Sequence, residues 1–201
     1  EANNNNLTSI DLSKAVDLRF FEISNNQLTS LDLSKNTKLY TVNCSRNKIE
    51  NSLQLSTTEL NSLNCSYNEL TTLNTSTSTN NLSLVNCSDN NLTTLDFRAN
   101  TKLTQIDCEW NQLTSILVDG LDSWLQVINC HRNKLTSLNL NDNSNLKKIN
   151  ISYNTLSNLN VSNNTKLTNL FCSNNNLTEL NITNNTDLTH LDAPYNKFNN
   201  C

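Results

Sequence analysis

The side chains of this chain that are best suited to chemistry are seven cysteines and two histidines. Thiols and imidazoles bind zinc, and a thiol activated by an imidazole can act as a nucleophile. However, His131 and His190 are far apart in the sequence, and neither has a partner at a spacing that implies a nucleophile and a base. The chain also lacks a glycine-rich phosphate loop, an HExxH motif and an EF-hand loop. We therefore expect no enzyme activity and no cofactor.

Six of the cysteines recur at a regular spacing. Their intervals are nearly equal, except for one that is twice as long, and they are Cys44, Cys65, Cys87, Cys108, Cys130 and Cys172. This spacing predicts an interior file of thiols on successive turns of the chain, about 5 Å apart. Parallel side chains have poor geometry for disulfides, so we expect free thiols that pack as small hydrophobic residues. Cys201 lies outside the file and is expected in a cap or in a bond to a partner.

Charge and composition narrow the function classes further. The 201 residues are 35% hydrophobic and 16% charged, with a net charge of −4, which argues against a disordered tail and against nucleic acid as a partner. No apolar run of about 18 residues exists, so membrane insertion is not expected. Asp89, Asp107 and Glu109 could converge on neighbouring turns and attract a cation. A solvated acidic patch is the simpler expectation, and no metal site is predicted.

An internal repeat supplies the elements that must position these side chains. Nine copies of the pattern LxxLxLxxNxL follow one another at steps of about 21 residues. They begin at Leu18, Leu39, Leu60, Leu82, Leu103, Leu125, Leu146, Leu167 and Leu188. The second half of each copy carries the related pattern LxxLxLxxN, as in residues 28–36. It is broken near Ser52, Thr75 and Gly120, where we expect local bulges.

The nested pattern resembles the leucine-rich repeat family, in particular the short bacterial class called IRREKO. The resemblance covers residues 5–198 and implies a β-rich, right-handed solenoid of about nine turns, with parallel strands and little or no α-helix. We expect one such solenoid domain over residues 1–201, as a fragment of a longer chain that lacks its caps. The resemblance also implies a bacterial protein that is secreted or exposed at the cell surface.

Asparagine is expected to make the turns, because the chain has 43 asparagines against one glycine and one proline. The ninth motif position is asparagine in every copy. We predict that its side chain points inward and bonds to backbone groups left unpaired by the bend. The outward fifth and seventh positions, mostly Asn or Asp and Ser, are expected to be scaffold.

Variable outward residues are concentrated in the third and eighth motif positions. The eighth position holds side chains that typically anchor binding surfaces. We predict as binding residues Arg46, Tyr67, Trp110, Arg132, Tyr153 and Tyr195. The corresponding face of the second half is mostly small and polar, as at Ser30, Asp96 and Asn181, and serves as an internal control. In the alternative interpretation, the rings only cover the edge where the chain bends.

Two function classes remain. The chain is either a recognition module that presents its strand face to a protein or glycan, or a structural or adhesive spacer that assembles through its ends. A third idea, ice binding, comes from threonines that recur in register, such as Thr29, Thr71, Thr93 and Thr114. Each of these directly follows a core residue, so a role in the turn is the preferred interpretation.

Overall fold

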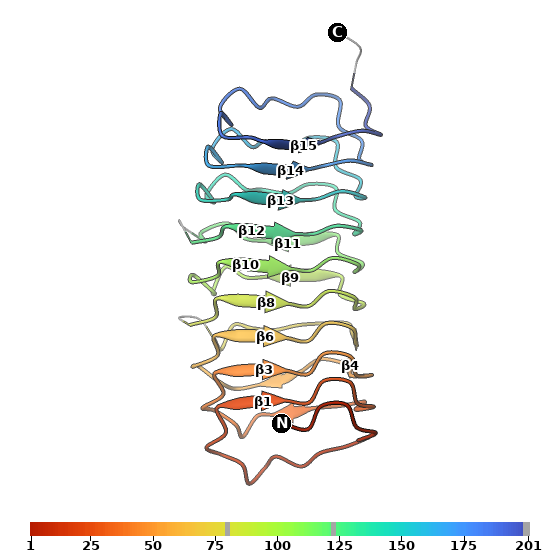
Figure 1. The fold of residues 1–201 in the computed structure, drawn as a ribbon, viewed down its shortest axis with the longest axis vertical. Helices are drawn as coiled ribbons and strands as arrows, with labels where there is room; N and C mark the ends of the chain where they lie inside the picture. The colour runs from red at the N-terminus through yellow and green to blue at the C-terminus, as the bar shows by residue number, and fades with distance from the viewer. Residues whose placement is uncertain (79–80, 122–123, 199–201) are drawn as a thin grey trace.

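The computed structural model describes residues 1–78, 81–121 and 124–198. These residues wind into a solenoid whose turns stack along one axis, with the two ends of the chain at opposite ends of the stack (Figure 1). All helices and strands assigned among the described residues are β-strands. They contain no helix of the length and apolar content needed to span a membrane. The predicted β-rich solenoid is confirmed.

The main sheet takes one three-residue strand from each of the nine copies. Its strands are β1 (Phe20–Glu22), β3 (Thr41–Asn43), β6 (Ser62–Asn64), β8 (Leu84–Asn86), β10 (Gln105–Asp107), β12 (Val127–Asn129), β13 (Lys148–Asn150), β14 (Asn169–Phe171) and β15 (His190–Asp192). All pairs are parallel and follow sequence order, and equivalent motif positions pair with one another, as Ile106 does with Ile128. Each motif position therefore forms a column that runs along the solenoid.

The second halves form only short pairs of parallel strands. These are β2 (Asp32–Leu33) with β5 (Gln54–Leu55), β4 (Glu50–Asn51) with β7 (Glu69–Leu70), and β9 (Thr94–Asp96) with β11 (Ser115–Leu117). Two of the expected deformations coincide with left-handed backbone, at Asn51 (φ 60°) beside Ser52 and at Gly120 (φ 76°). A glycine suits the second position because it adopts positive φ without steric cost.

Leucine and its aliphatic neighbours fill the interior, together with the predicted file of thiols. The six regularly spaced cysteines are buried and free. Burial raises the pKa of the Cys44 thiol to about 12, because the charged thiolate loses its hydration. The Cys108 and Cys130 sulfurs lie 3.5 Å apart, within hydrogen-bond distance. Cys201 lies outside the described residues.

The asparagines of the ninth position form a second internal column, as predicted. The Asn111 amide donates to the carbonyls of Cys87, Cys108 and Glu109 at 3.0 to 3.2 Å. Its Oδ1 accepts from the Leu92 backbone N–H at 3.0 Å. One side chain therefore satisfies four backbone groups and ties two turns together.

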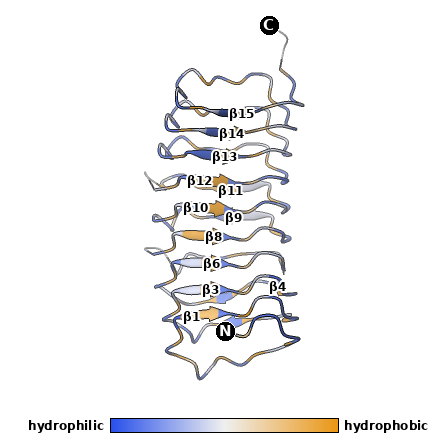
Figure 2. Ribbon diagram, in the orientation of Figure 1, coloured by the Kyte–Doolittle hydropathy of each residue, from blue (hydrophilic) through white to orange (hydrophobic). Residues whose placement is uncertain are grey.

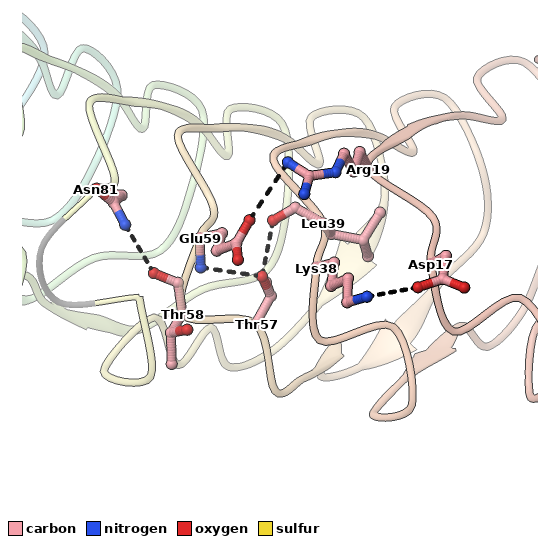
Figure 3. A network of polar contacts seen from close by, with 8 residues as sticks. All are labelled: Asp17, Arg19, Lys38, Leu39, Thr57, Thr58, Glu59 and Asn81. Atoms are coloured by element: carbon pink, nitrogen blue, oxygen red, sulfur yellow. Dashed lines mark hydrogen bonds and ion pairs between the residues drawn. The ribbon is translucent and has the colours of Figure 1, made fainter.

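Polar side chains also hold the corner that precedes the main sheet (Figure 3). Thr57 is buried and occupies the place that asparagine takes in most second halves. Its hydroxyl donates to the Leu39 carbonyl at 2.7 Å and accepts from the Glu59 N–H at 3.3 Å. The Glu59 carboxylate lies 3.8 Å from the Arg19 guanidinium of the preceding copy. These contacts tie the corners of the first two copies together.

Candidate recognition surface

The eighth motif position is the turn that follows each main-sheet strand, not part of the strand. Its residue has φ between 51° and 57° in all nine copies. The ninth-position asparagine bonds to this turn through its side chain, as predicted, but the eighth residue is the one that adopts the left-handed conformation. This conformation disfavours bulky side chains and suits Asn, Asp or Gly. Arginine, tyrosine and tryptophan therefore occupy the column against the local backbone preference.

Four of the six predicted binding residues are aromatic, and all four rings are exposed. The exposed fraction is 45% for Tyr67, 49% for Trp110, 44% for Tyr153 and 78% for Tyr195. Such exposure leaves ring surface accessible to a partner, and aromatic side chains are frequent anchors of interfaces. Their role in binding stays a prediction.

Five of the predicted residues form two stacks. The Arg132 guanidinium carbon lies 4.1 Å from the ring centre of Trp110 and 4.6 Å from that of Tyr153, so the cation sits between two rings. Arg46 lies 4.2 Å from the ring centre of Tyr67. Cation–π attraction of this kind stabilises a fixed side-chain arrangement. Tyr195 lies apart, two copies beyond Tyr153.

Asp89 lies between the two stacks in the same column. Its carboxylate is hydrogen-bonded to Tyr67 and is close enough to Arg46 and Glu109 for charge interactions. Partial burial raises the pKa of Asp89, and the like charge of Glu109 adds to this effect. The acidic patch expected from the sequence is therefore in contact with the aromatic column.

The seventh position is buried in the six copies that carry serine there, in contrast to the prediction that it points outward. In four of these copies the serine backbone N–H donates to the side chain of the fifth residue of the same copy, at Ser45, Ser66, Ser88 and Ser152. In the second copy, Ser45 donates to Asn43 Oδ1 through its backbone N–H at 3.2 Å and its hydroxyl at 2.8 Å. Small side chains suit this place because the chain bends over it. These serines therefore have the expected scaffold role, but their side chains lie in the interior of the solenoid.

Two adjacent copies break this serine column beside Trp110 and Arg132. Glu109 and His131 replace serine there, and the Asn129 amide donates to Glu109 Oε2 at 3.0 Å and to Asp107 Oδ1 at 3.2 Å. Burial raises the pKa of Asp107, and Glu109 adds to the rise. Among the described residues, no group of three or more His, Cys, Asp or Glu side chains is placed to hold a metal ion.

His131 joins this site although the sequence pattern did not single it out as a binding residue. Its ring contacts those of Tyr153 and Trp110 edge to face, with centroids 5.2 and 6.4 Å away. His131 Nε2 accepts a hydrogen bond from Arg132 Nε at 3.2 Å. The sequence signal was the loss of serine in two consecutive copies. We call Glu109, Trp110, His131, Arg132 and Tyr153 the central cluster.

The main sheet beside this column changes polarity along the solenoid. Figure 2 shows β8 and β12 in the hydrophobic colour and β13 to β15 in the hydrophilic colour. The third position contributes exposed Phe20 and Leu84 to the first part. Lys148, Asn169 and His190 take this position in the last part. The central cluster lies where the apolar part of the sheet gives way to the polar part.

The control face of the second half contains a hollow and an ion pair that were not expected from the sequence. A hollow of about 640 Å³ lies there, lined in part by Thr72, Asn74 and Asp96. Asp96 forms a two-point ion pair with Arg98, at 2.7 and 3.0 Å. Two of the threonines considered for ice binding donate to backbone carbonyls of the preceding copy, Thr71 to Asn51 and Thr114 to Thr93, each at 3.3 Å. Within the described part of the chain, this face holds no exposed aromatic column.

Comparison with solved structures identifies the architecture. The functional domain of InlJ from Listeria monocytogenes, which includes a cysteine ladder, matches with a TM-score of 0.89 and 33% sequence identity, over 94% of this chain and 42% of that one. A leucine-rich repeat protein of Leptospira interrogans matches with a TM-score of 0.84 and 23% identity, over 98% and 55% of the two chains. This chain folds as a leucine-rich repeat solenoid.

The same leucine-rich repeat fold occurs in the plant peptide hormone receptor RGFR1 in complex with RGF2, with a TM-score of 0.79 and 21% identity over 93% of this chain and 33% of the receptor. Because their identities are so low, the likeness to the receptor and to the Leptospira protein concerns the fold alone. This leucine-rich repeat chain spans between a third and just over half of the length of these three proteins. No family model matches the sequence, and neither does any curated protein.

Proposed function

We propose that the chain is a non-catalytic recognition module that binds a protein partner through the central cluster. One observation carries the proposal: bulky aromatic and arginine side chains occupy turn positions that disfavour them, at the place where the buried serine column is also interrupted. Departures from local preference that the fold does not require are typical of functional sites. A ring that only covered the bend would not need this replacement of serine.

The geometry suits a binding surface because its anchors are already held in place. Arg132 lies between two rings and has little conformational freedom, so its ordering on binding costs less than that of a free arginine. Trp110 and Tyr153 remain about half exposed and offer broad contact surface with a polar group at one end. Preorganised aromatic and arginine anchors are typical of protein interfaces.

The kind of repeat supports an extracellular location for this recognition. Short nested repeats resemble those of bacterial surface proteins, so we place the recognition event outside the cell. A peptide hormone receptor with the same fold forms a complex with its ligand, which supports the use of such a solenoid for peptide or protein recognition. The partner of this chain is to be sought among surface proteins of host or neighbouring cells.

A second candidate function is a spacer that assembles through its ends. One observation favours it: the last described copy leaves Leu191 and Phe198 exposed by 47% and 39%. Apolar side chains at the end of a stack can pack against another molecule. In that case, variants of the central cluster would leave association unchanged, whereas Leu191→Ser would abolish it.

The test begins with a screen of surface proteins and glycans against the whole chain. With a ligand in hand, Trp110→Ala, Arg132→Ala and Tyr153→Ala should each weaken binding by about 1 to 4 kcal/mol, as truncations of interface anchors do. Asn181→Ala, on the opposite face, is the matched control and should bind as the unaltered chain does. Isothermal titration calorimetry measures both. A ligand whose affinity is unaffected by all three cluster variants would refute the assignment.

A further inference from the structure

We infer that His131 makes the central cluster sensitive to pH, so that protonation of its ring loosens the stack formed by Trp110, Arg132 and Tyr153 and weakens partner binding. The effect on binding rests on the proposed function. The structural change can be tested without a partner.

The hydrogen bond from Arg132 to His131 requires a neutral imidazole. Arg132 Nε donates to His131 Nε2 at 3.2 Å, so Nε2 must carry a lone pair and the ring proton must lie on Nδ1. Protonation places a second N–H on Nε2, and two donors then face each other. The hydrogen bond that helps to hold Arg132 between the two rings is lost in the charged state.

The surroundings of His131 determine the pH at which its ring is protonated. The charged groups around it are Glu109 and, through the Asn129 amide, Asp107 on the preceding copy, with Arg132 beside it. Tyr153 on the next copy presents its ring. Within the described residues, His131 Nδ1 is buried without a hydrogen-bond partner. A cationic imidazole is drawn toward Glu109 and repelled by Arg132.

Burial lowers the pKa of His131 below its usual value of 6.5, Glu109 opposes this shift and Arg132 adds to it. The stack is therefore intact at neutral pH. As the pH falls through the lowered pKa, the ring gains its charge and releases Arg132. A histidine whose folded pKa is lowered also destabilises the folded state on acidification, because the unfolded chain takes up the proton more readily.

The experiment uses the whole chain with Trp124→Phe, which leaves Trp110 as the sole tryptophan. Trp110 fluorescence and the His131 ring signals in NMR spectra are followed between pH 7.5 and 4.5. We expect both to change together with a midpoint below 6.5. His131→Ser, which installs the residue that six copies carry in this column, should abolish the fluorescence change. His190→Ser, the matched control, should retain it.

Persistence of the fluorescence change in His131→Ser would overturn the inference, as would an NMR midpoint at or above 6.5. The NMR signals of the unaltered ring keep the test valid if His131→Ser fails to fold. With a ligand from the screen, affinity should fall about five-fold or more from pH 7.5 to 5.5, the size of a typical coupling between sites. If His131 titrates but the affinity for the ligand does not change, the pH dependence of binding is contradicted. If Trp110→Ala leaves the affinity unchanged, the proposed function is contradicted.

Discussion

At the scale of single residues, the ninth-position asparagines replace much of the backbone pairing that longer strands would supply. Each main-sheet strand has only three residues, so few backbone groups are paired within the ladder itself. Asn111 compensates by serving three carbonyls and one N–H in two neighbouring turns. The amide is suited to this because it carries both donors and an acceptor.

Asn111→Ala should therefore destabilise the fold by about 2 to 4 kcal/mol, because it leaves buried backbone groups without partners. Urea unfolding followed by circular dichroism measures the loss. Asn176→Ala is the control, since Asn176 is only half-buried and makes one hydrogen bond of 3.4 Å to the Thr155 carbonyl. Equal stability changes in the two variants would show that the internal asparagine column is not a main support.

The left-handed turn gives a second prediction at this scale. Tyr195 has φ 57° and the most exposed ring of the column, so its replacement disturbs little packing. Tyr195→Gly should be more stable than Tyr195→Ala by about 1 kcal/mol, because glycine lacks the Cβ that makes this backbone unfavourable. Thermal unfolding of the two variants side by side provides the measurement. A more stable alanine variant would argue against left-handed backbone at this position in solution.

The residue scale also shows how far the sequence could predict the structure. The inward asparagines, the thiol file and the outward aromatic column followed from periodicity, because the repeat fixes which positions are equivalent. The burial of Ser45 and the left-handed conformation of Trp110 did not. Alternation of side chains holds within a strand, and here the strand ends at the fifth motif position, so the rule was applied beyond its range. His131 was missed for the same reason.

At the scale of elements, the columns of the interior determine the chemistry of the core. The thiols of the file are buried, and burial raises the pKa values of Cys44, Cys65 and Cys87. Apolar surroundings keep such thiols neutral and unreactive. Their function is packing, in the same slot that Ile23 and Ile151 fill in other copies.

The six file thiols should consequently resist iodoacetamide at pH 8 in the native state and react within the same period in urea, as counted by mass spectrometry. Stability should also depend on alkaline pH. Burial raises the pKa of Cys44 from the ordinary 9.0 to about 12, so its contribution to the stability of the fold is complete below pH 9 and decreases as the pH rises toward 12. Native labelling of Cys44 at pH 8 would contradict the burial of the file.

At the scale of the whole molecule, the structure is a one-dimensional array in which each turn contacts its neighbours. Strand order follows sequence order throughout the main sheet. Stability in such arrays is close to a sum of terms for single copies and for their interfaces. The number of copies can therefore change without changing the fold, provided that whole copies are added or removed.

Deletion of residues 167–187, which is one whole copy, should leave a folded solenoid with a smaller urea m-value, because less surface is exposed on unfolding. Deletion of residues 177–187 alone, the second half of that copy, should disrupt it, since β15 could no longer reach the edge of the main sheet. Far-ultraviolet circular dichroism and urea titration distinguish the two. A cooperative, native-like half-copy deletion would show that the two halves are interchangeable.

The unequal length of the copies has a consequence for how the chain finds its own register. Because the copies are nearly identical, a strand could pair with the equivalent strand of the wrong copy, which is a known hazard of repetitive strands. The steps from Leu60 to Leu82 and from Leu103 to Leu125 are one residue longer than the others. In a slipped arrangement, the longer turns, with Thr75 and Gly120, would lie against shorter ones and leave a side chain out of phase with its column. These two insertions therefore specify a single register for a chain that is otherwise periodic.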